Sequence, residues 1–303
     1  MLTLDDFKKI TLQEKAVFDT HYKQYPPGHS GELFSTMVCW GHYVEYRYLK
    51  TKDSIVILSK GVDKTVLHPP IGPLNKDLLG EIINLAKQEN FIFGFIKKKE
   101  KEFITTQFPT LTFCENRDFF DYVYVASDLA ELSGTKYGKI RNRYNKFTKN
   151  YSHTTEEITS ENMDEVNHFL KRWCLWRDCK SDELLENERK AILYAMSHFF
   201  DLGLMGLALR INDSIQAIAI YEKMNPDTVV VHFEKGSPDF DGIYKAINKE
   251  TAQRVQQEVT FIDREEDLGV PGLRKAKMSY HPHHFIELFY VKKESLRTTM
   301  LSS

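Results

Sequence analysis

The sequence predicts an α/β (α+β) protein of two tandem units, each a mixed, mainly antiparallel sheet flanked by helices. Two observations carry this prediction. The same order of elements occurs in each half of the 303 residues: a hairpin, a strand, a helix, a strand, a short helix and a strand. Hydrophobic residues make up 42% of the chain, which is enough to bury a core in each unit.

The first half shows apolar strands around one amphipathic helix. The helix is predicted from an apolar stripe that includes Leu78, Ile82 and Ala86, with Asn75 or Asp77 as its cap. Strands are expected at residues 42–47, 55–58, 65–68, 91–96 and 119–125, and a shorter helix near residues 100–107.

The second half repeats this order. Residues 207–211 and 215–221 flank Asn212, Asp213 and Ser214, a sequence typical of a hairpin turn. A helix is predicted from Ile243 onward, where apolar residues recur at helical spacing as far as Val255. The remaining strands are expected at residues 229–233, 259–262 and 285–291, with a short helix before the last of them.

A helical segment with two stripes lies between the halves. Its apolar stripe is Tyr137, Ile140, Tyr144, Phe147 and Tyr151. Its basic stripe is Lys136, Lys139, Arg143 and Lys146, with Arg141 and Lys149 nearby. The basic stripe would suit the phosphates of tRNA, with a tyrosine stacked on a base. A solvated face of an ordinary amphipathic helix explains it equally well. Two further helical blocks follow, at residues 163–173 and 189–202.

These elements divide the chain into three parts. We expect a first unit at residues 1–130, a second unit at residues 131–294 that carries the site, and a tail without regular structure at residues 295–303.

Composition narrows the class of protein. The formal net charge is -2, so global charge selects neither nucleic acid nor membrane as a partner. The cysteines Cys39, Cys114, Cys174 and Cys179 form no disulfide framework, and Cys174 and Cys179 are predicted to be idle thiols. No run approaches the roughly 20 apolar residues of a membrane span, and the N-terminus is not typical of a signal peptide. The expected localisation is cytoplasmic.

The segment at residues 266–280 concentrates charge beside two apolar runs. It is predicted to be an acidic turn followed by a short basic helix, with Pro271 in the first turn. Asp267 is expected to cap the helix. Arg274 and Lys277 are three residues apart and therefore share one helix face.

This segment, from Asp267 to Lys277 with Tyr280 and Pro282 just beyond, and the segment at residues 132–147 resemble the DUF2156 family. That family includes the soluble C-terminal domain of bacterial phosphatidylglycerol lysyltransferases. The resemblance spans nearly the whole chain and implies a tandem GNAT-like fold, similar to that of the Fem transferases. It also implies a function, because characterised members move an aminoacyl group from charged tRNA to a lipid hydroxyl.

The resemblance and the chemistry of acyl transfer together suggest site residues in the second half. Asp267, Glu234 and Tyr280 are the predicted catalytic residues, with a carboxylate as the proton acceptor. Arg274 and Lys277 would hold a phosphate or a developing oxyanion. In the alternative interpretation these residues have only structural roles. Asp267 then caps the helix, and Arg274 and Lys277 are cations near the end of a surface helix. The other predicted substrate-binding residues are Lys136, Lys139, Arg141 and Arg143.

The resulting prediction is an acyl or aminoacyl transferase that needs no bound cofactor. It would move an aminoacyl group from charged tRNA to a lipid or another amine or hydroxyl acceptor. One alternative is an acyl-CoA-dependent N-acyltransferase, but the glycine turn at residues 236–242 carries Asp239 and Asp241, which would repel a pyrophosphate. Another is a non-catalytic module that binds tRNA or a phosphorylated ligand. No metal site is predicted, because the spacing of His281, His283 and His284 fits no zinc set.

Overall fold

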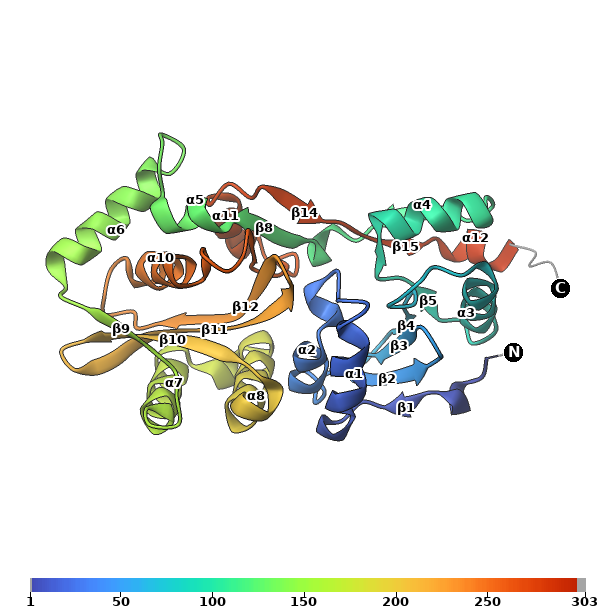
Figure 1. Ribbon diagram of the computed structural model, residues 1–303, viewed down its shortest axis with the longest axis horizontal. Helices are drawn as coiled ribbons and strands as arrows, with labels where there is room; N and C mark the ends of the chain where they lie inside the picture. Colours follow the sequence, from blue (N-terminus) through green and yellow to red (C-terminus); the bar gives the residue numbers. More distant parts are fainter. Residues whose placement is uncertain (1, 299–303) are drawn as a thin grey trace. The chain divides into compact units, whose positions relative to one another are not determined.

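The computed structural model describes residues 2–298 and divides into two compact units (Figure 1). One unit comprises residues 1–120 and 286–303, and the other comprises residues 121–285.

A five-stranded sheet organises the first unit, in the order β1-β2-β3-β4-β5. Its strands are β1 (Lys8–Lys9), β2 (Glu45–Lys50), β3 (Ile55–Lys60), β4 (Thr65–Leu67) and β5 (Ile92–Phe93). Only β4 and β5 pair in parallel, across the helix α3 (Lys76–Gln88). The side chain of Asn75 accepts hydrogen bonds from the backbone of Asp77 and Leu78, which confirms Asn75 as the cap of α3.

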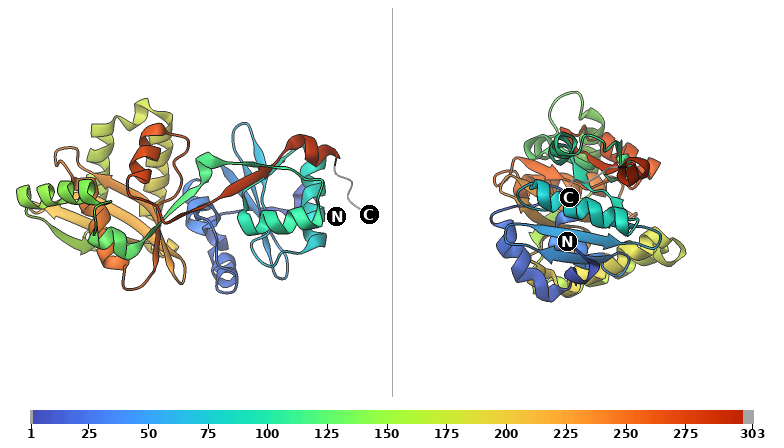
Figure 2. Two further views of the ribbon diagram at one scale, coloured as in Figure 1. Left: turned by 90° about the horizontal axis from the view of Figure 1, so that it is seen from above. Right: turned by 90° about the vertical axis from the view of Figure 1, so that its right-hand side faces the viewer.

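The remaining elements of the first unit are short. Its helices are η1 (Leu4–Asp6), η2 (Leu12–Glu14), α1 (Lys15–Tyr22), η3 (Ser30–Glu32), α2 (Phe34–Cys39), α4 (Lys98–Gln107), η4 (Arg117–Phe119) and α12 (Lys293–Thr298). A second sheet has the order β6-β15-β7, with β6 (Ile96–Lys97), β15 (Leu288–Val291) and β7 (Phe113–Glu115). β15, which is drawn in red near the C-terminal end of the ribbon in Figures 1 and 2, is therefore the central strand of this sheet by its pairing.

A seven-stranded sheet organises the second unit, in the order β14-β8-β13-β12-β11-β10-β9. Its strands are β8 (Asp121–Val125), β9 (Thr154–Glu157), β10 (Met205–Ile211), β11 (Ser214–Asn225), β12 (Thr228–Gly236), β13 (Phe261–Asp263) and β14 (His284–Ile286). β12 and β13 pair in parallel and are joined by α10 (Ile243–Val255). Asn212 and Asp213 have φ of 51° and 60°, so they form the predicted two-residue hairpin turn.

Helices cover both faces of this sheet. α5 (Ala126–Glu131), α6 (Gly138–Asn150) and α10 lie on one face, and α7 (Met163–Arg177) and α8 (Glu183–Ser197) lie on the other (Figure 1). The shorter helices are η5 (Cys179–Ser181), α9 (Phe199–Leu202) and α11 (Pro271–Met278). Alternate strand residues such as Leu207, Leu209 and Ala219 enter a buried core that α5, α6 and α10 complete.

Two strands pair differently from the sequence-based assignment. β8 was expected to close the first half, but it pairs with β13 in the second unit. β15 was expected in the second half, but it pairs with β6 and β7 in the first. The reason is that apolar alternation identifies a strand and not its hydrogen-bonding partner.

The chain end also differs from the prediction. α12 occupies residues 293–298, where an unstructured tail was expected from residue 295. Leu296 is buried, and the Ser295 hydroxyl accepts a hydrogen bond from the Thr112 backbone at 3.0 Å. Residues 299–303 of the predicted tail lie outside the described residues.

Candidate functional site

The loop between β13 and α11 is held by a buried ion pair. Asp267 is completely buried, and its carboxylate accepts hydrogen bonds from Arg274 Nη2 at 2.7 Å, Arg274 Nε at 2.8 Å and the Gly269 backbone at 2.9 Å. The Tyr122 hydroxyl also donates to it. Burial alone would raise the pKa of Asp267, but the hydrogen bonds from Arg274, Tyr122 and Gly269 outweigh it and lower the pKa to about 2. A carboxylate so stabilised is a weak proton acceptor.

The prediction that Asp267 caps the helix is wrong. The residue before the first turn of α11 is Val270, and Pro271 takes the first helical position, as predicted. Leu268 and Gly269 adopt left-handed backbone conformations with φ of 51° and 73°, and this turn carries Asp267 away from the helix start.

Lys277 also stabilises this loop, through hydrogen bonds to its backbone. Its ammonium group donates to the backbone carbonyls of Arg264, Glu265 and Glu266. An ammonium group has three donors, so these carbonyls use all of them. Burial lowers the pKa of Lys277, and the neighbouring Glu266 opposes that shift. These contacts give Lys277 and Arg274 a structural role, and their predicted role in phosphate binding stays a prediction.

A second polar cluster, which we call the strand-end cluster, lies where β12 and β13 end below α10. It comprises Glu234, Lys245, Asn248, Arg264 and Tyr280. The Glu234 carboxylate accepts from Arg264 Nε at 3.0 Å and from Arg264 Nη2, and its other oxygen accepts from Asn248 Nδ2 at 3.3 Å. The Arg264 and Glu234 side chains are only 15% and 10% exposed. Glu234, predicted as a base, is therefore part of an ion pair.

Arg264 and Lys245 place two cations against one aromatic ring. The ring of Tyr280 lies 4.7 Å from the Arg264 guanidinium carbon and 4.2 Å from Lys245 Nζ. Tyr280 is 3% exposed, and burial raises the pKa of its hydroxyl, so the hydroxyl stays neutral. Its predicted catalytic role stays a prediction.

The strand-end cluster contains donors without a protein partner. Arg264 Nη1 is buried and makes no hydrogen bond within residues 2–298. Lys245 is half-buried, and within the same residues it has neither an ion pair nor a hydrogen bond. Burial, with a contribution from nearby Arg264, lowers the pKa of Lys245 to about 8. The arrangement can therefore exchange a proton near neutral pH and donate hydrogen bonds to an oxyanion.

Sequence reasoning missed Lys245 and Arg264. Arg264 directly follows β13, and Lys245 lies in the first turn of α10 after Gly242. Those positions, at a strand end and at a helix start, were a usable signal, but only the folded chain brings the two side chains to the same tyrosine ring.

The predicted basic stripe lies on α6 and, at Lys136, on the turn before it, and most of its cations have acidic partners. Lys136 pairs with Asp128 at 3.0 Å, and Asp241 pairs with Arg143 at 2.8 Å and Lys146 at 3.2 Å. All three cations are at least half exposed, so these pairs contribute little stability and can exchange for other anions.

Two further cations of this helix behave differently. Arg141 donates to the backbone carbonyls of Leu132 and Gly134 and so orders the loop before the helix. Lys139 is exposed and has no ion pair among the described residues.

The acidic glycine turn packs tightly under α6. Gly242 has φ of 95°, and a Cβ placed there would lie 3.0 Å from the Arg143 carbonyl oxygen and 3.1 Å from Phe147 Cβ. The turn is therefore occupied by α6 and by the ion pairs of Asp241.

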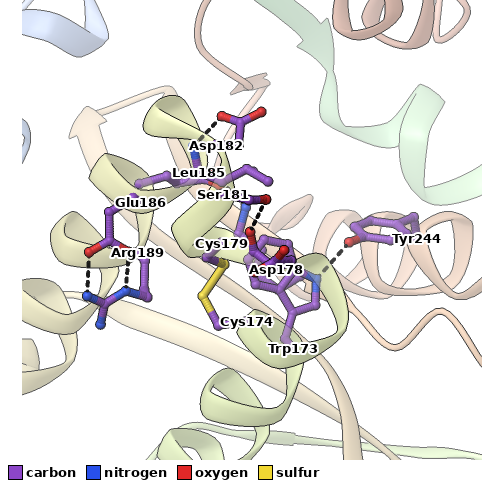
Figure 3. The surroundings of a disulfide bond; sticks show 12 residues. Trp173, Cys174, Asp178, Cys179, Ser181, Asp182, Leu185, Glu186, Arg189 and Tyr244 are labelled. Atoms are coloured by element: carbon purple, nitrogen blue, oxygen red, sulfur yellow. Dashed lines mark hydrogen bonds and ion pairs between the residues drawn. A yellow bond between two sulfur atoms is a disulfide. The ribbon is translucent and has the colours of Figure 1, made fainter.

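The prediction of idle thiols at Cys174 and Cys179 is wrong. The two residues form a disulfide that joins the end of α7 to η5, with a Cα–Cα distance of 5.3 Å (Figure 3). A five-residue separation across a helix end brings the two sulfur atoms together, which spacing alone does not reveal.

Residues 2–298 contain no group of three or more His, Cys, Asp or Glu side chains placed to hold a metal ion. None of their helices is both long enough and apolar enough to cross a membrane.

The parallel pair β12 and β13 around α10, set in a mainly antiparallel sheet with polar groups at the strand ends, defines a GNAT-like acyltransferase fold. A family model described as phosphatidylglycerol lysyltransferase, C-terminal, matches residues 22–292, and the chain belongs to this family. The family and fold predicted from the sequence are thereby confirmed.

Solved structures share this fold. A conserved protein of unknown function from Bacteroides thetaiotaomicron is 31% identical, with a TM-score of 0.87 over 94% of this chain and 98% of that one. L-PGS from Bacillus licheniformis is 14% identical, with a TM-score of 0.64 over 92% of this chain and 91% of that one. FemX is 12% identical, with a TM-score of 0.57 over 96% of this chain and 98% of that one. The last two show the fold alone.

A curated relative matches a shorter stretch. An uncharacterised protein of Mycoplasmoides gallisepticum is 24% identical over 174 residues. The match covers 57% of this chain and spans 56% of the length of that protein.

Proposed function

We propose that this protein is an aminoacyltransferase that moves an aminoacyl group from charged tRNA to a hydroxyl or amine acceptor. The observation that carries the proposal is the strand-end cluster, where Lys245 and the buried Arg264 Nη1 offer donors with no hydrogen-bond partner within residues 2–298. Membership of a family described as phosphatidylglycerol lysyltransferase, C-terminal, supports aminoacyl transfer as the reaction class.

The proposed chemistry is one direct displacement. The acceptor oxygen or nitrogen forms a bond to the aminoacyl carbonyl carbon, and the ester bond to the tRNA ribose breaks. Neutral Lys245 takes the proton from the acceptor and returns it to the leaving ribose hydroxyl. Arg264 Nη1 donates to the oxyanion that develops on the carbonyl oxygen.

The proposed tRNA surface is α6 with the turn before it. Lys139 is available on the helix, and Lys136 of the turn and Arg143 can exchange their exposed carboxylate partners for phosphates. Arg141 would act indirectly, through the loop that it orders.

The geometry of the glycine turn argues against the acyl-CoA alternative. A pyrophosphate on this turn would need the space above Gly242, which Arg143 and Phe147 occupy. It would also meet the carboxylate of Asp241, which Arg143 and Lys146 already bind.

Lys245→Met tests the proposal. Purified protein is incubated with charged tRNAs and either a lipid extract or a small amine, and loss of aminoacyl-tRNA is followed from pH 6 to pH 9. The wild-type rate should rise as Lys245 deprotonates near pH 8 and then level off. The variant should be slower by roughly 10²–10⁴-fold, with no such rise.

Lys223→Met is the control, because Lys223 is an exposed lysine on β11. A wild-type rate in the Lys245 variant would refute the role of Lys245. Binding of tRNA without discharge by the wild-type protein would favour the non-catalytic module.

A further inference from the structure

A cavity of about 370 Å³ lies between α7, η5 and α8, on the sheet face opposite α10. Its size is at the lower end of the range for small-molecule sites. Apolar side chains and the disulfide form most of its lining: Leu170, Trp173, Leu175, Ile192, Leu193 and the Cys174–Cys179 bridge.

The walls of this cavity are fixed by polar contacts behind them. The Trp173 indole donates to the Tyr244 hydroxyl at 3.2 Å (Figure 3). Lys235 Nζ lies 4.6 Å from the centre of the Trp173 ring. Lys235 is buried and pairs with Glu188 of α8 at 2.6 Å. Glu186 and Arg189 pair at 2.6 Å along the same helix. The cavity is therefore largely formed before any ligand enters.

Large apolar side chains are exposed around the opening. Leu175 and Leu193 both line the cavity and are 81% and 37% exposed. Exposed apolar side chains of this size at a cavity indicate a binding surface.

The charge of the lining is positive. Lys171, Lys180 and Arg189 line the cavity, and Asp178 is the one carboxylate in that lining among the described residues. Arg189 is satisfied by Glu186, whereas Lys171 and Lys180 are exposed and have no ion pair within residues 2–298. Two ammonium groups at the edge of an apolar cavity complement a ligand with one apolar chain and one anionic head.

We propose that this cavity binds the alkyl chain of an anionic amphiphile, with Lys171 and Lys180 holding its carboxylate or phosphate head. The ligand comes either from solution as a monomer or from an anionic bilayer. This proposal does not depend on the aminoacyl transfer proposed above, because none of its residues belongs to the strand-end cluster.

Calorimetric titration of the full chain with dodecanoate below its micelle concentration tests the proposal. Co-sedimentation with phosphatidylcholine vesicles, with and without phosphatidylserine, is the bilayer arm. Leu193→Trp fills the cavity, and Lys171→Glu with Lys180→Glu reverses the charge at its edge. Each change should weaken binding by about tenfold or more. The matched control is Lys149→Glu with Lys223→Glu, which makes the same charge change at exposed lysines outside the lining.

Saturable binding in either arm that both cavity variants weaken and the control retains would support the proposal, and the arm that binds identifies the source. Binding in neither arm would overturn it. So would binding that the cavity variants leave unchanged while their unfolding transitions match that of the wild-type protein.

Discussion

Single residues in the segment 264–277 show why charge pattern alone misplaces a site. Arg274 and Lys277 share a helix face, as their spacing predicts, yet each is directed to the preceding loop. Within residues 2–298, a buried donor of this segment without a hydrogen-bond partner is Arg264 Nη1, and the sequence signal for Arg264 is its position directly after a strand. A cation binds a substrate only with donors that its own fold leaves available.

Asp267→Asn should destabilise the second unit without a direct effect on chemistry. The change removes the carboxylate charge that Arg274 binds at position 267 and should lower the free energy of unfolding by about 3 kcal/mol. Urea unfolding measures this, with Asp164→Asn at an exposed position of α7 as the control. An Asp267 variant with wild-type stability and no activity would instead support the predicted catalytic role.

His232 makes the stability of the second unit depend on pH. Its ring nitrogens lie 2.7 Å from Glu265 and 2.8 Å from Glu222. Burial alone would lower the pKa of His232, but the hydrogen bonds to the two carboxylates outweigh it and raise the pKa to about 10. Because the pKa is raised from 6.5, the stabilisation is complete below pH 6.5 and is lost as the pH rises through 10.

Comparison of His232→Gln with the wild type checks this prediction. At pH 6 the variant should be less stable by about 3 kcal/mol, and the difference should shrink by pH 10. Urea unfolding at a series of pH values measures the difference. A gap independent of pH would show that His232 is not charged in the folded protein.

At the scale of elements, periodicity in the sequence identified most of the helices and strands that the structure contains. The hairpin of β10 and β11, the helix α3 with Asn75 as its cap, and α10 all appear near their expected positions. The disulfide was missed, because a pair of cysteines at a helix end depends on the direction the chain takes after it.

Packing of α6 on the start of α10 rests on Gly242. An alanine there would have a strained backbone at φ of 95° and would crowd the Arg143 carbonyl and Phe147. We expect Gly242→Ala to lower the thermal midpoint and to cost about 1–3 kcal/mol. Gly272→Ala in α11 is the matched control, because a Cβ there meets nothing within 4 Å. Equal midpoints for the two variants would contradict the close packing of α6.

At the scale of the whole molecule, the units are not consecutive halves of the chain. β15, the central strand of the three-stranded sheet in the first unit, comes from the end of the sequence. β8 belongs to the second unit but comes from the region assigned to the first half. The stability of the first unit therefore depends on residues 286–298.

Phe289→Ala tests that dependence. Phe289 is 4% exposed on β15, between β6 and β7, with Lys101 Nζ 3.9 Å from its ring centre. The variant should lose about 3–5 kcal/mol. Hydrogen exchange should quicken in β6 and β7 and stay unchanged in β10 to β12. Tyr290→Ala, at a more exposed position of the same strand, should have a smaller effect. Faster exchange confined to the second unit would contradict the pairing of β15.

The sequence by itself determined the family, the order of the elements and the turns, because these depend on local periodicity, on capping and glycine chemistry, and on short motifs. It also drew attention to the loop after β13, although not to Arg264, whose Nη1 has no hydrogen-bond partner within residues 2–298. Only the tertiary structure decided which strands pair, which cations are already bound and where Lys245 meets Arg264. Those outcomes depend on contacts between residues far apart in the chain, which no local pattern encodes.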